Sequence, residues 1–290
     1  MTNVQADFTA LQNNATAALS DNLRRNVVLL KEGMITKLPM QSEGLTRTIK
    51  VQGKLDAQAL AEDTTATLQK TTETAVTLGI GKIVSVSRLT EESLQFGGMT
   101  ATMQWFLDEQ VAAIVEDMEE AVTGLAAGFS NEVVGTTDKP ADIPGILAAA
   151  LQIKLQTNNS SNYGNIKAVL SVQSAFEAIK ASQVANNNSS ILSNEKSSIA
   201  TAVDAVPDMN GFIANVAGVN VYESLAIQEN ATDALNMVYD PRAIVGSYQD
   251  KVKVRADDDV LNWADVFGSC VFSGFTIYRQ ERAVRLPTAK

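Results

Sequence analysis

The sequence contains no histidine and only one cysteine, Cys270, among its 290 residues. Without histidine it cannot form a Ser-His-Asp or Cys-His catalytic arrangement, and with one cysteine it can form neither an intrachain disulfide bond nor a Cys/His metal site. We therefore expect no catalytic residues, no cofactor site and no metal site, so the sequence does not indicate an enzyme. Cys270 lies in an apolar run, where a lone cysteine is typically a small buried hydrophobic residue.

Positive charge and long apolar runs are also scarce. The chain has 23 lysines and arginines against 33 acidic residues, a net charge of −10. Nucleic-acid binding requires clustered cations, but the densest group, residues 251–255, is followed at once by three aspartates at 257–259. No run reaches the roughly 20 apolar residues of a membrane span, and the first residues lack the pattern of a signal peptide. The sequence thus predicts a soluble protein made in the cytoplasm, with no membrane and no specific nucleic-acid partner.

Three groups of residues look like binding motifs but lack the required spacing. Residues 79–82, Gly-Ile-Gly-Lys, lack the length and the final Ser or Thr of a phosphate loop. Residues 257–259 lack the glycine and terminal glutamate of a calcium loop, and we interpret them as a turn. The third group lies on one predicted helix, whereas a cation site needs oxygens that converge from several directions. We interpret it as a face turned to solvent or to another subunit: Glu116, Asp117, Glu119 and Glu120.

Residues 4–31 place apolar side chains at helical spacing, with polar residues between them. The stripe is too thin to support a domain by itself, and it consists of Val4, Phe8, Leu11, Ala15, Ala18, Leu19 and Leu23. Two interpretations remain open: an amphipathic arm that packs on a neighbouring molecule, or a surface helix of the chain's own fold.

Residues 45–80 change to the alternation that is typical of strands. Residues 45–52 and 74–80 each place apolar side chains on one face, and the stretch 53–70 joins them. This pattern predicts a long β-hairpin with a wide tip, whose apolar face consists of Leu45, Ile49, Val51, Val76 and Leu78. Because an isolated two-stranded ribbon is marginally stable in water, we expect the hairpin to need a partner surface.

The strongest periodic signal lies between Thr90 and Gly128. Thr90 followed by two glutamates is typical of a helix start. The apolar stripe that follows comprises Met99, Met103, Phe106, Leu107, Val111, Ile114, Val115, Met118, Val122 and Leu125. A helix of roughly 35 residues would span about 50 Å, and we expect the hairpin of a neighbouring subunit to lie across it.

The remaining chain mixes helices and strands without a βαβ rhythm, which predicts an α+β fold. A second helix is expected over residues 140–156 and a short one over 174–183. The inward positions of the second helix would be Ile143, Ile146, Leu147, Ala150 and Leu151. Strands are expected at 83–87, 166–172, 218–222, 235–239, 251–255 and 274–286.

The order of these parts resembles the Hong Kong 97-like fold of the major capsid proteins of tailed, double-stranded-DNA bacteriophages. The likeness is carried mainly by residues 215–224, 240–244 and 274–286. It implies five regions: an amino-terminal arm (1–30), a peripheral domain with a long spine helix (31–44 and 80–139), an extended β-hairpin loop (45–79), a compact axial domain (140–262), and carboxyl-terminal strands that return to the peripheral domain (263–290).

The resemblance also implies a function. It predicts a structural protein that assembles as hexamers and pentamers into an icosahedral head around double-stranded DNA, without binding that DNA specifically. The expected partners are other copies of the chain together with portal, scaffolding and decoration proteins, and the expected location is the virion, after assembly in the host cytoplasm. Some members of the family crosslink lysines to asparagines, but Lys54 and Lys70 near the hairpin tip are interpreted as ordinary solvated lysines.

Two alternatives stay open. An encapsulin-type nanocompartment shell shares the fold and is poorly separated by sequence. A flagellin-like filament protein would explain the richness in Ala, Thr, Asn and Gln, but such chains end in a long helix, whereas strands are predicted here.

Acidic and basic residues are separated along the chain. Residues 91–142 hold many acids and hardly any basic residue before Lys139. Basic residues gather in two other places, at Arg24, Arg25, Lys31 and Lys37 and at Arg279, Arg282 and Arg285. This separation predicts contacts between oppositely charged patches of different subunits.

Overall fold

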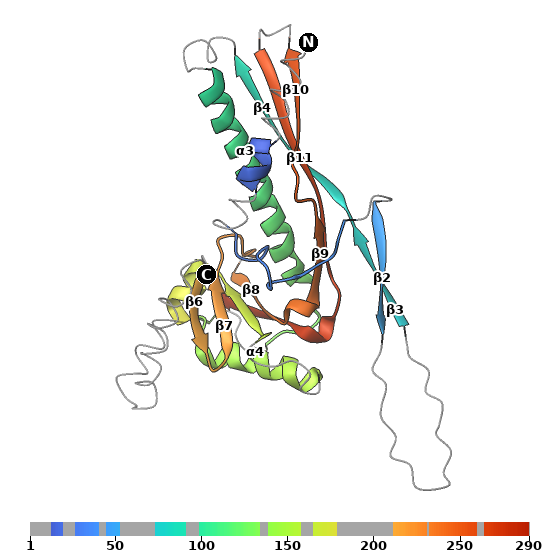
Figure 1. Cartoon of the computed structure of the whole chain (residues 1–290). Coiled ribbons are helices and arrows are strands. Elements are labelled where there is room, and N and C mark those ends of the chain that lie inside the picture. Colours follow the sequence, from blue (N-terminus) through green and yellow to red (C-terminus); the bar gives the residue numbers. More distant parts are fainter. Residues whose placement is uncertain are drawn as a thin grey trace, which may run out of the picture.

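The computed structural model describes residues 13–19, 27–40, 45–52, 73–90, 99–133, 139–157, 165–178, 211–230, 232–259 and 264–289. It contains two five-stranded sheets, two long helices and a separate two-stranded ribbon (Figure 1). Several predicted features lie outside the described residues, among them the hairpin tip, Lys54, Lys70, Arg24 and Arg25.

The first sheet is built around β11 (Ala264–Ile277), the longest strand. One edge of β11 pairs with β4 (Gly81–Thr90), and the other edge pairs with β10 (Lys253–Asp259) and then with β9 (Ile244–Tyr248). These three pairings are antiparallel, and the short β1 (Thr36–Lys37) adds to β9 in parallel. Residues 257–259, predicted as a turn, instead end β10 and pair with residues 264–266.

Helix α3 (Met99–Thr123) lies against one face of this sheet and continues as the 3-10 helix η1 (Gly124–Gly128) (Figure 1). The predicted stripe makes the contact, because Leu107, Val111, Ile114, Val115, Met118 and Val122 are all buried. At 1.5 Å per residue the described helix is about 37 Å long. Thr90, the predicted cap, is the last residue of β4 and pairs with Ala264, while residues 91–98, where the predicted helix would begin, lie outside the described residues.

The amino-terminal segment 27–35 runs through the same core. Val27, Leu29 and Met34 are buried there, together with Ala15 and Leu19 from a helical segment at residues 13–19. Part of the predicted amphipathic stripe therefore packs on the chain's own fold.

The second sheet has the strand order β12-β8-β5-β7-β6. Its strands are β5 (Lys167–Leu170), β6 (Phe212–Val216), β7 (Val219–Glu223), β8 (Asp233–Tyr239) and β12 (Ala283–Ala289). The turn between β6 and β7 places Ala217 and Gly218 at φ of 49° and 91°, and two successive positive values are typical of a tight hairpin turn.

Helix α4 (Ile143–Gln156) packs on β12 and β8 and forms a second core with this sheet. The carboxylate of Asp142 caps it by accepting a hydrogen bond from the Gly145 N–H at 2.8 Å. Its buried positions are Gly145, Ile146, Ala149, Ala150 and Ile153. Leu151, predicted to face inward, is exposed because the buried stripe passes from Ala150 to Ile153.

The two sheets are joined where the chain crosses between them. β8 passes to β9 through η3 (Pro241–Ala243), and β11 passes to β12 through η4 (Gln280–Arg282). The crossings bond to each other, since the Asp240 N–H donates to the Arg282 carbonyl at 3.0 Å. The Asp240 carboxylate, which is completely buried, accepts hydrogen bonds from Arg282 at 3.0 Å and from Arg242 at 2.8 Å.

The strand pairing divides the chain differently from the predicted regions. β9 and β10 fall within the range expected for the axial domain, yet they pair with β11 in the first sheet. β12, expected to return to the peripheral domain, pairs with β8 in the second sheet. Alternating patterns look alike in both sheets, so the pattern predicts a strand but not the sheet that it joins. The peripheral and axial domains themselves stay predictions.

The ribbon consists of β2 (Thr46–Gln52) and β3 (Glu73–Gly79), which pair antiparallel as predicted, with Ile49 opposite Val76. It projects beside the first sheet (Figure 1), and the Tyr278 hydroxyl, just after β11, donates to the Lys50 carbonyl of β2 at 3.3 Å.

The root of the ribbon is held by backbone contacts. The Ile80 N–H donates to the Leu45 carbonyl at 2.7 Å. Gly79 passes so close to Gly274 of β11 that a Cβ on Gly274 would lie 2.1 Å from the Gly79 carbonyl oxygen. A glycine at 274 is therefore required for this approach.

Candidate functional site

The described residues hold no group of three or more His, Cys, Asp or Glu side chains that could bind a metal ion. No described helix is long and apolar enough to cross a membrane. Residues 79–82 span the end of β3 and the start of β4, so they do not form the loop before a helix that a phosphate site needs. Three surfaces and a pocket, all formed by described residues, remain as candidates for a functional site.

The first surface is the face of β4, β11 and β10 that turns away from α3, here called the open sheet face. Strand alternation sends Leu89, Phe267 and Val271 toward the core and the intervening side chains outward. The register aligns the outward residues in three rows: Val84, Cys270 and Lys253; Val86, Gly268 and Arg255; Arg88, Val266 and Asp257. The face thus has an apolar strip along β4 and β11, with Lys253 and Arg255 beside it on β10 and the row of Arg88 and Asp257 at one end.

This apolar strip is unusual because two of its valines are exposed. Val84 and Val86 are 46% and 61% exposed, although β-branched side chains in strands usually pack against neighbours on a half-buried surface. Cys270 is only partly buried, which corrects the prediction of a fully buried thiol. An apolar strip of this kind is typical of a surface that another polypeptide covers.

The second surface is the outer side of α3, and it is strongly acidic. The helix contains no lysine or arginine, and its exposed residues include Asp108, Glu109, Glu116, Asp117 and Glu120. As predicted, Glu116, Asp117 and Glu120 face outward. The two sides of the layer formed by α3 and the first sheet therefore carry opposite charge.

The third surface is the hairpin. Its apolar face pairs Ile49 with Val76, both half-buried, while Leu45 at the root is 64% exposed. Lys50 and Glu73 form an exposed ion pair at 3.1 Å, which contributes little to stability. The ribbon therefore has apolar area left uncovered by its own subunit.

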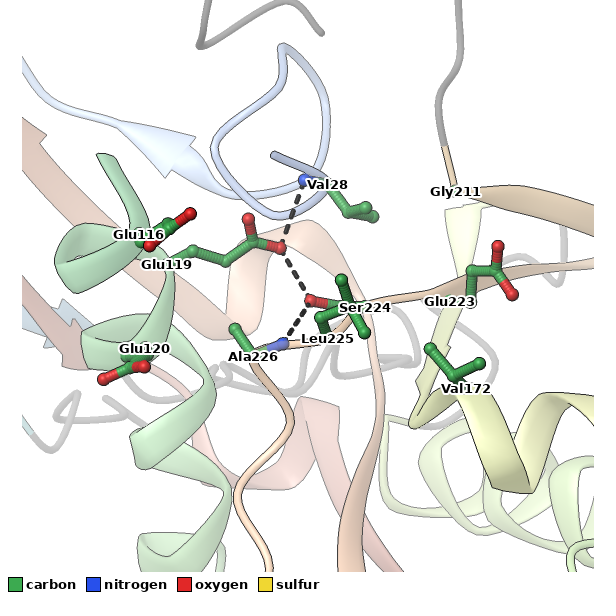
Figure 2. Close-up of a pocket in the computed structure, with 10 residues that line it drawn as sticks. All are labelled: Val28, Glu116, Glu119, Glu120, Val172, Gly211, Glu223, Ser224, Leu225 and Ala226. Carbon is green, nitrogen blue, oxygen red and sulfur yellow. Dashed lines mark hydrogen bonds between the residues drawn. The ribbon is translucent and has the colours of Figure 1, made fainter. Parts of the chain in front are cut away.

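A pocket of about 500 Å³ opens between α3, the end of β7 and the amino-terminal segment (Figure 2). Its lining combines carboxylates with apolar side chains: Val28, Glu116, Glu119, Glu120, Val172, Gly211, Glu223, Ser224, Leu225 and Ala226. Leu225 is almost fully exposed at its rim.

Glu119 departs from the sequence-based prediction of a solvated or inter-subunit face, because it is only 5% exposed. Its Oε1 atom accepts hydrogen bonds from the Val28 N–H at 3.2 Å and from the Ser224 hydroxyl at 2.8 Å (Figure 2). Burial raises the pKa of the Glu119 carboxyl, while hydrogen bonds from Ser224, Val28 and Leu29 and the charge of Lys31 act in the opposite direction.

Several of the basic residues expected to contact other subunits have acidic partners inside the same chain. Arg282 is buried against Asp240, and Arg285 pairs with Glu132, a residue of the predicted acidic stretch. Lys37 pairs with Asp250, and Arg279 with Glu281 at 3.6 Å. The prediction that these basic residues reach other subunits is therefore wrong for Arg282, whose side chain is inaccessible.

Solved structures of phage capsids share this fold at low sequence identity. A chain from the capsid of Ralstonia phage GP4 matches with a TM-score of 0.65 and 11% identity, covering 93% of this chain and 91% of that one. The head structure of Helicobacter pylori bacteriophage KHP40 gives 0.63 and 9%, covering 88% and 86%. The chain has the fold of phage capsid proteins.

The capsid fold extends beyond these phage particles. The virus-like particle from Pyrococcus furiosus matches with a TM-score of 0.57 and 12% identity, covering 96% of this chain and 98% of that one. No protein-family model matches the sequence, and no curated protein matches it either. The likeness therefore lies in three-dimensional structure, as expected for a family defined by architecture.

Proposed function

We propose that this chain is the major capsid protein of a tailed, double-stranded-DNA bacteriophage, a structural protein that assembles as hexamers and pentamers into an icosahedral head. The observation that carries the proposal is the match to head and capsid chains along nearly the full length of both partners, with 93% and 91% covered for the Ralstonia phage protein.

The uncovered surfaces support assembly. The open sheet face exposes Val84 and Val86, and the hairpin keeps uncovered apolar area on a ribbon that projects from the subunit (Figure 1). In an isolated monomer each feature would promote association with other polypeptide chains. In a shell, copies of the chain would cover one another at both places.

The open sheet face fits a neighbour's hairpin better than the outer side of α3 does. The hairpin contact predicted from the sequence was α3, but that side carries five exposed acids. An apolar ribbon face loses little by covering the valines of β4, whereas covering the carboxylates would remove charges from water. We therefore place the neighbour's hairpin on the open sheet face in this proposal.

Cys270 offers a direct test of the hairpin contact. Because it is the single cysteine and lies on the open sheet face, Ile49→Cys should form a disulfide between subunits under mild oxidation of assembled particles. The matched variant combines Cys270→Ser, Ile49→Cys and Ala113→Cys and tests the outer side of α3. Crosslinked dimers from the matched variant alone would favour α3 instead.

In this proposal the first sheet with α3 corresponds to the peripheral domain, and the second sheet with α4 to the axial domain that would line the capsomer centre. The chain would act without a catalytic site or cofactor and would enclose DNA without reading its sequence. Portal, scaffolding and decoration proteins are its proposed partners, and the virion, after assembly in the host cytoplasm, is its proposed location.

One rival has a specific observation in its favour. The match to the Pyrococcus furiosus particle covers 98% of that chain, and an encapsulin-type nanocompartment shell would need the same surfaces. A flagellin-like filament fits less well, because the solved structures described above are capsid, head and particle chains.

Electron microscopy of the purified protein tests the proposal. We expect closed icosahedral shells, or capsomers that close into shells at higher protein concentration. A protein that stays monomeric at high concentration, or one that forms open filaments, would contradict a shell function. Co-expression with the neighbouring genes separates the two shell types, since a phage head should incorporate a portal and package DNA.

A further inference from the structure

Glu119 connects three parts of the subunit that are far apart in the sequence. It belongs to α3, its carboxylate accepts from the backbone of Val28 in the amino-terminal segment, and it accepts from Ser224 at the end of β7. The Ser224 oxygen in turn accepts from the Ala226 N–H at 3.2 Å (Figure 2). One buried carboxylate therefore fastens the amino-terminal segment to the long helix and to the second sheet.

The charged groups around Glu119 are mostly acidic. The amino-terminal segment supplies Lys31, whose own pKa is lowered by burial. The helix and the end of β7 contribute three more carboxylates to the same pocket: Glu116, Glu120 and Glu223.

The strands behind the carboxylate add tyrosines. Burial raises the pKa of Tyr239 of β8, and the charges of Tyr222 and Glu119 raise it further. Burial also raises the pKa of Tyr222. Both tyrosines therefore stay protonated near physiological pH and bring no charge to Glu119.

We propose that Glu119 is a proton-sensitive clasp, in which the protonated side chain holds the amino-terminal segment against α3 and the second sheet more firmly than the ionised side chain does. A carboxyl group protonated at Oε2 still offers Oε1 to Val28 and Ser224, so both hydrogen bonds survive. The charge that must be buried disappears at the same time. The adjacent pocket gives water and protons access to the carboxyl group.

The sign of the pH effect follows from the raised pKa of Glu119. The folded state binds this proton more readily than the unfolded state does, whose glutamate keeps a pKa near the ordinary 4.5. Between that value and the raised one, stability is gained as the pH falls and is lost as the pH rises. The clasp concerns the folded subunit and does not depend on the shell function.

Amide hydrogen exchange of the full chain at several pH values between 5 and 7.5, corrected for the intrinsic exchange rate, measures the clasp directly. In the natural sequence, protection of the peptide covering residues 27–31 should increase as the pH falls, by at most about tenfold per pH unit. Glu119→Gln keeps the acceptor without the charge, so its protection should be high and independent of pH. Glu116→Gln is the matched control on the same helix and pocket, and should behave like the natural sequence.

Three results would overturn the proposal. First, exchange in Glu119→Gln could depend on pH as it does in the natural sequence. Second, residues 27–31 could be less protected in Glu119→Gln than in the natural sequence at every pH. Third, the pH-dependent protection could appear equally in the peptide that covers α4, which would make the effect global. Ser224→Ala keeps the test decisive if Glu119→Gln does not fold. The Ser224 hydroxyl stabilises the ionised carboxylate by donating to it, so its removal should move the change in amide protection to higher pH. A change in protection at the same pH as in the natural sequence would contradict the clasp.

Discussion

Gly274 occupies the place where the hairpin root passes closest to β11. An alanine there would put its Cβ against backbone atoms, 2.1 Å from the Gly79 oxygen and 3.1 Å from the Ile80 Cα, so the two strands must separate. We expect Gly274→Ala to lower the free energy of unfolding by about 1–3 kcal/mol, as overpacking typically does. The measurement is urea unfolding followed by tryptophan fluorescence.

Gly81→Ala is the matched control for this prediction. It lies close by, and its new Cβ would meet only the Ser273 oxygen, at an ordinary 3.9 Å. Its effect should stay within about 0.5 kcal/mol. Equal effects of the two alanines would mean that close backbone approach does not determine the hairpin root.

Asp240 is the second residue on which much depends. Replacing it with asparagine leaves the buried guanidinium of Arg282 without its carboxylate, and breaking a buried pair typically costs about 3–5 kcal/mol. The exposed pair of Lys37 and Asp250 provides the comparison, because Asp250→Asn should cost less than about 1 kcal/mol. Thermal unfolding of both variants checks this, and similar losses would show that burial of Asp240 is energetically unimportant.

Single residues also show which side-chain environments the sequence pattern can predict and which it cannot. The sequence groups Glu119 with the acids on the polar side of the helix, yet it lies four residues after Val115 and three before Val122, which is the spacing of the buried stripe. That spacing was a usable signal, but the donors from Val28 and Ser224 come from distant parts of the chain and leave no local trace. Cys270 was misjudged for a related reason, because an apolar run does not show whether both faces of its strand are covered.

At the scale of elements, the hairpin can be separated from the fold. Its strands pair only with each other, so deletion of residues 53–71 should leave a folded subunit. We expect that variant to fail to form stable shells, since it loses a contact repeated on every subunit. Circular dichroism checks the fold and electron microscopy checks assembly, and shells of normal yield would show that the hairpin is dispensable.

Elements with one strong local pattern were predictable, and those defined by distant pairing were not. The two hairpin strands and the buried stripe of α3 follow from periodicity within each segment. For α4 the pattern predicted the helix, but of its expected inward positions only Ile146 and Ala150 are buried. The assignment of β9 and β10 to the first sheet, and of β12 to the second, depends on crossings at Asp240 and Arg282 that no local pattern encodes. The aspartates at 257–259 show the same limit, because pairing with β11 overrides their preference for turns.

At the scale of the whole molecule, the predicted contact between oppositely charged patches of different subunits is tested at the amino-terminal arginines, Arg24 and Arg25. Four of the other basic residues named with them have acidic partners inside the chain: Lys37, Arg279, Arg282 and Arg285. Arg24 and Arg25 lie outside the described residues and precede, by one residue, the segment that Glu119 holds. Reversing both charges should slow shell formation without unfolding the subunit, and the difference should shrink at high salt. Light scattering during assembly measures the rate, with Lys251→Glu as a control of the same sign change. Equal rates would exclude a role for these arginines.

The central place of β11 also has a consequence for synthesis of the protein. β4 and β9 can complete their pairing only with β11, and β8 pairs on one side with β12. Neither sheet is therefore complete until residues 264–289 have been synthesised. A ribosome adds about 5–20 residues per second, and strands that pair over such distances fold slowly. A polypeptide that lacks residues 264–289 therefore cannot complete either sheet or present the open sheet face.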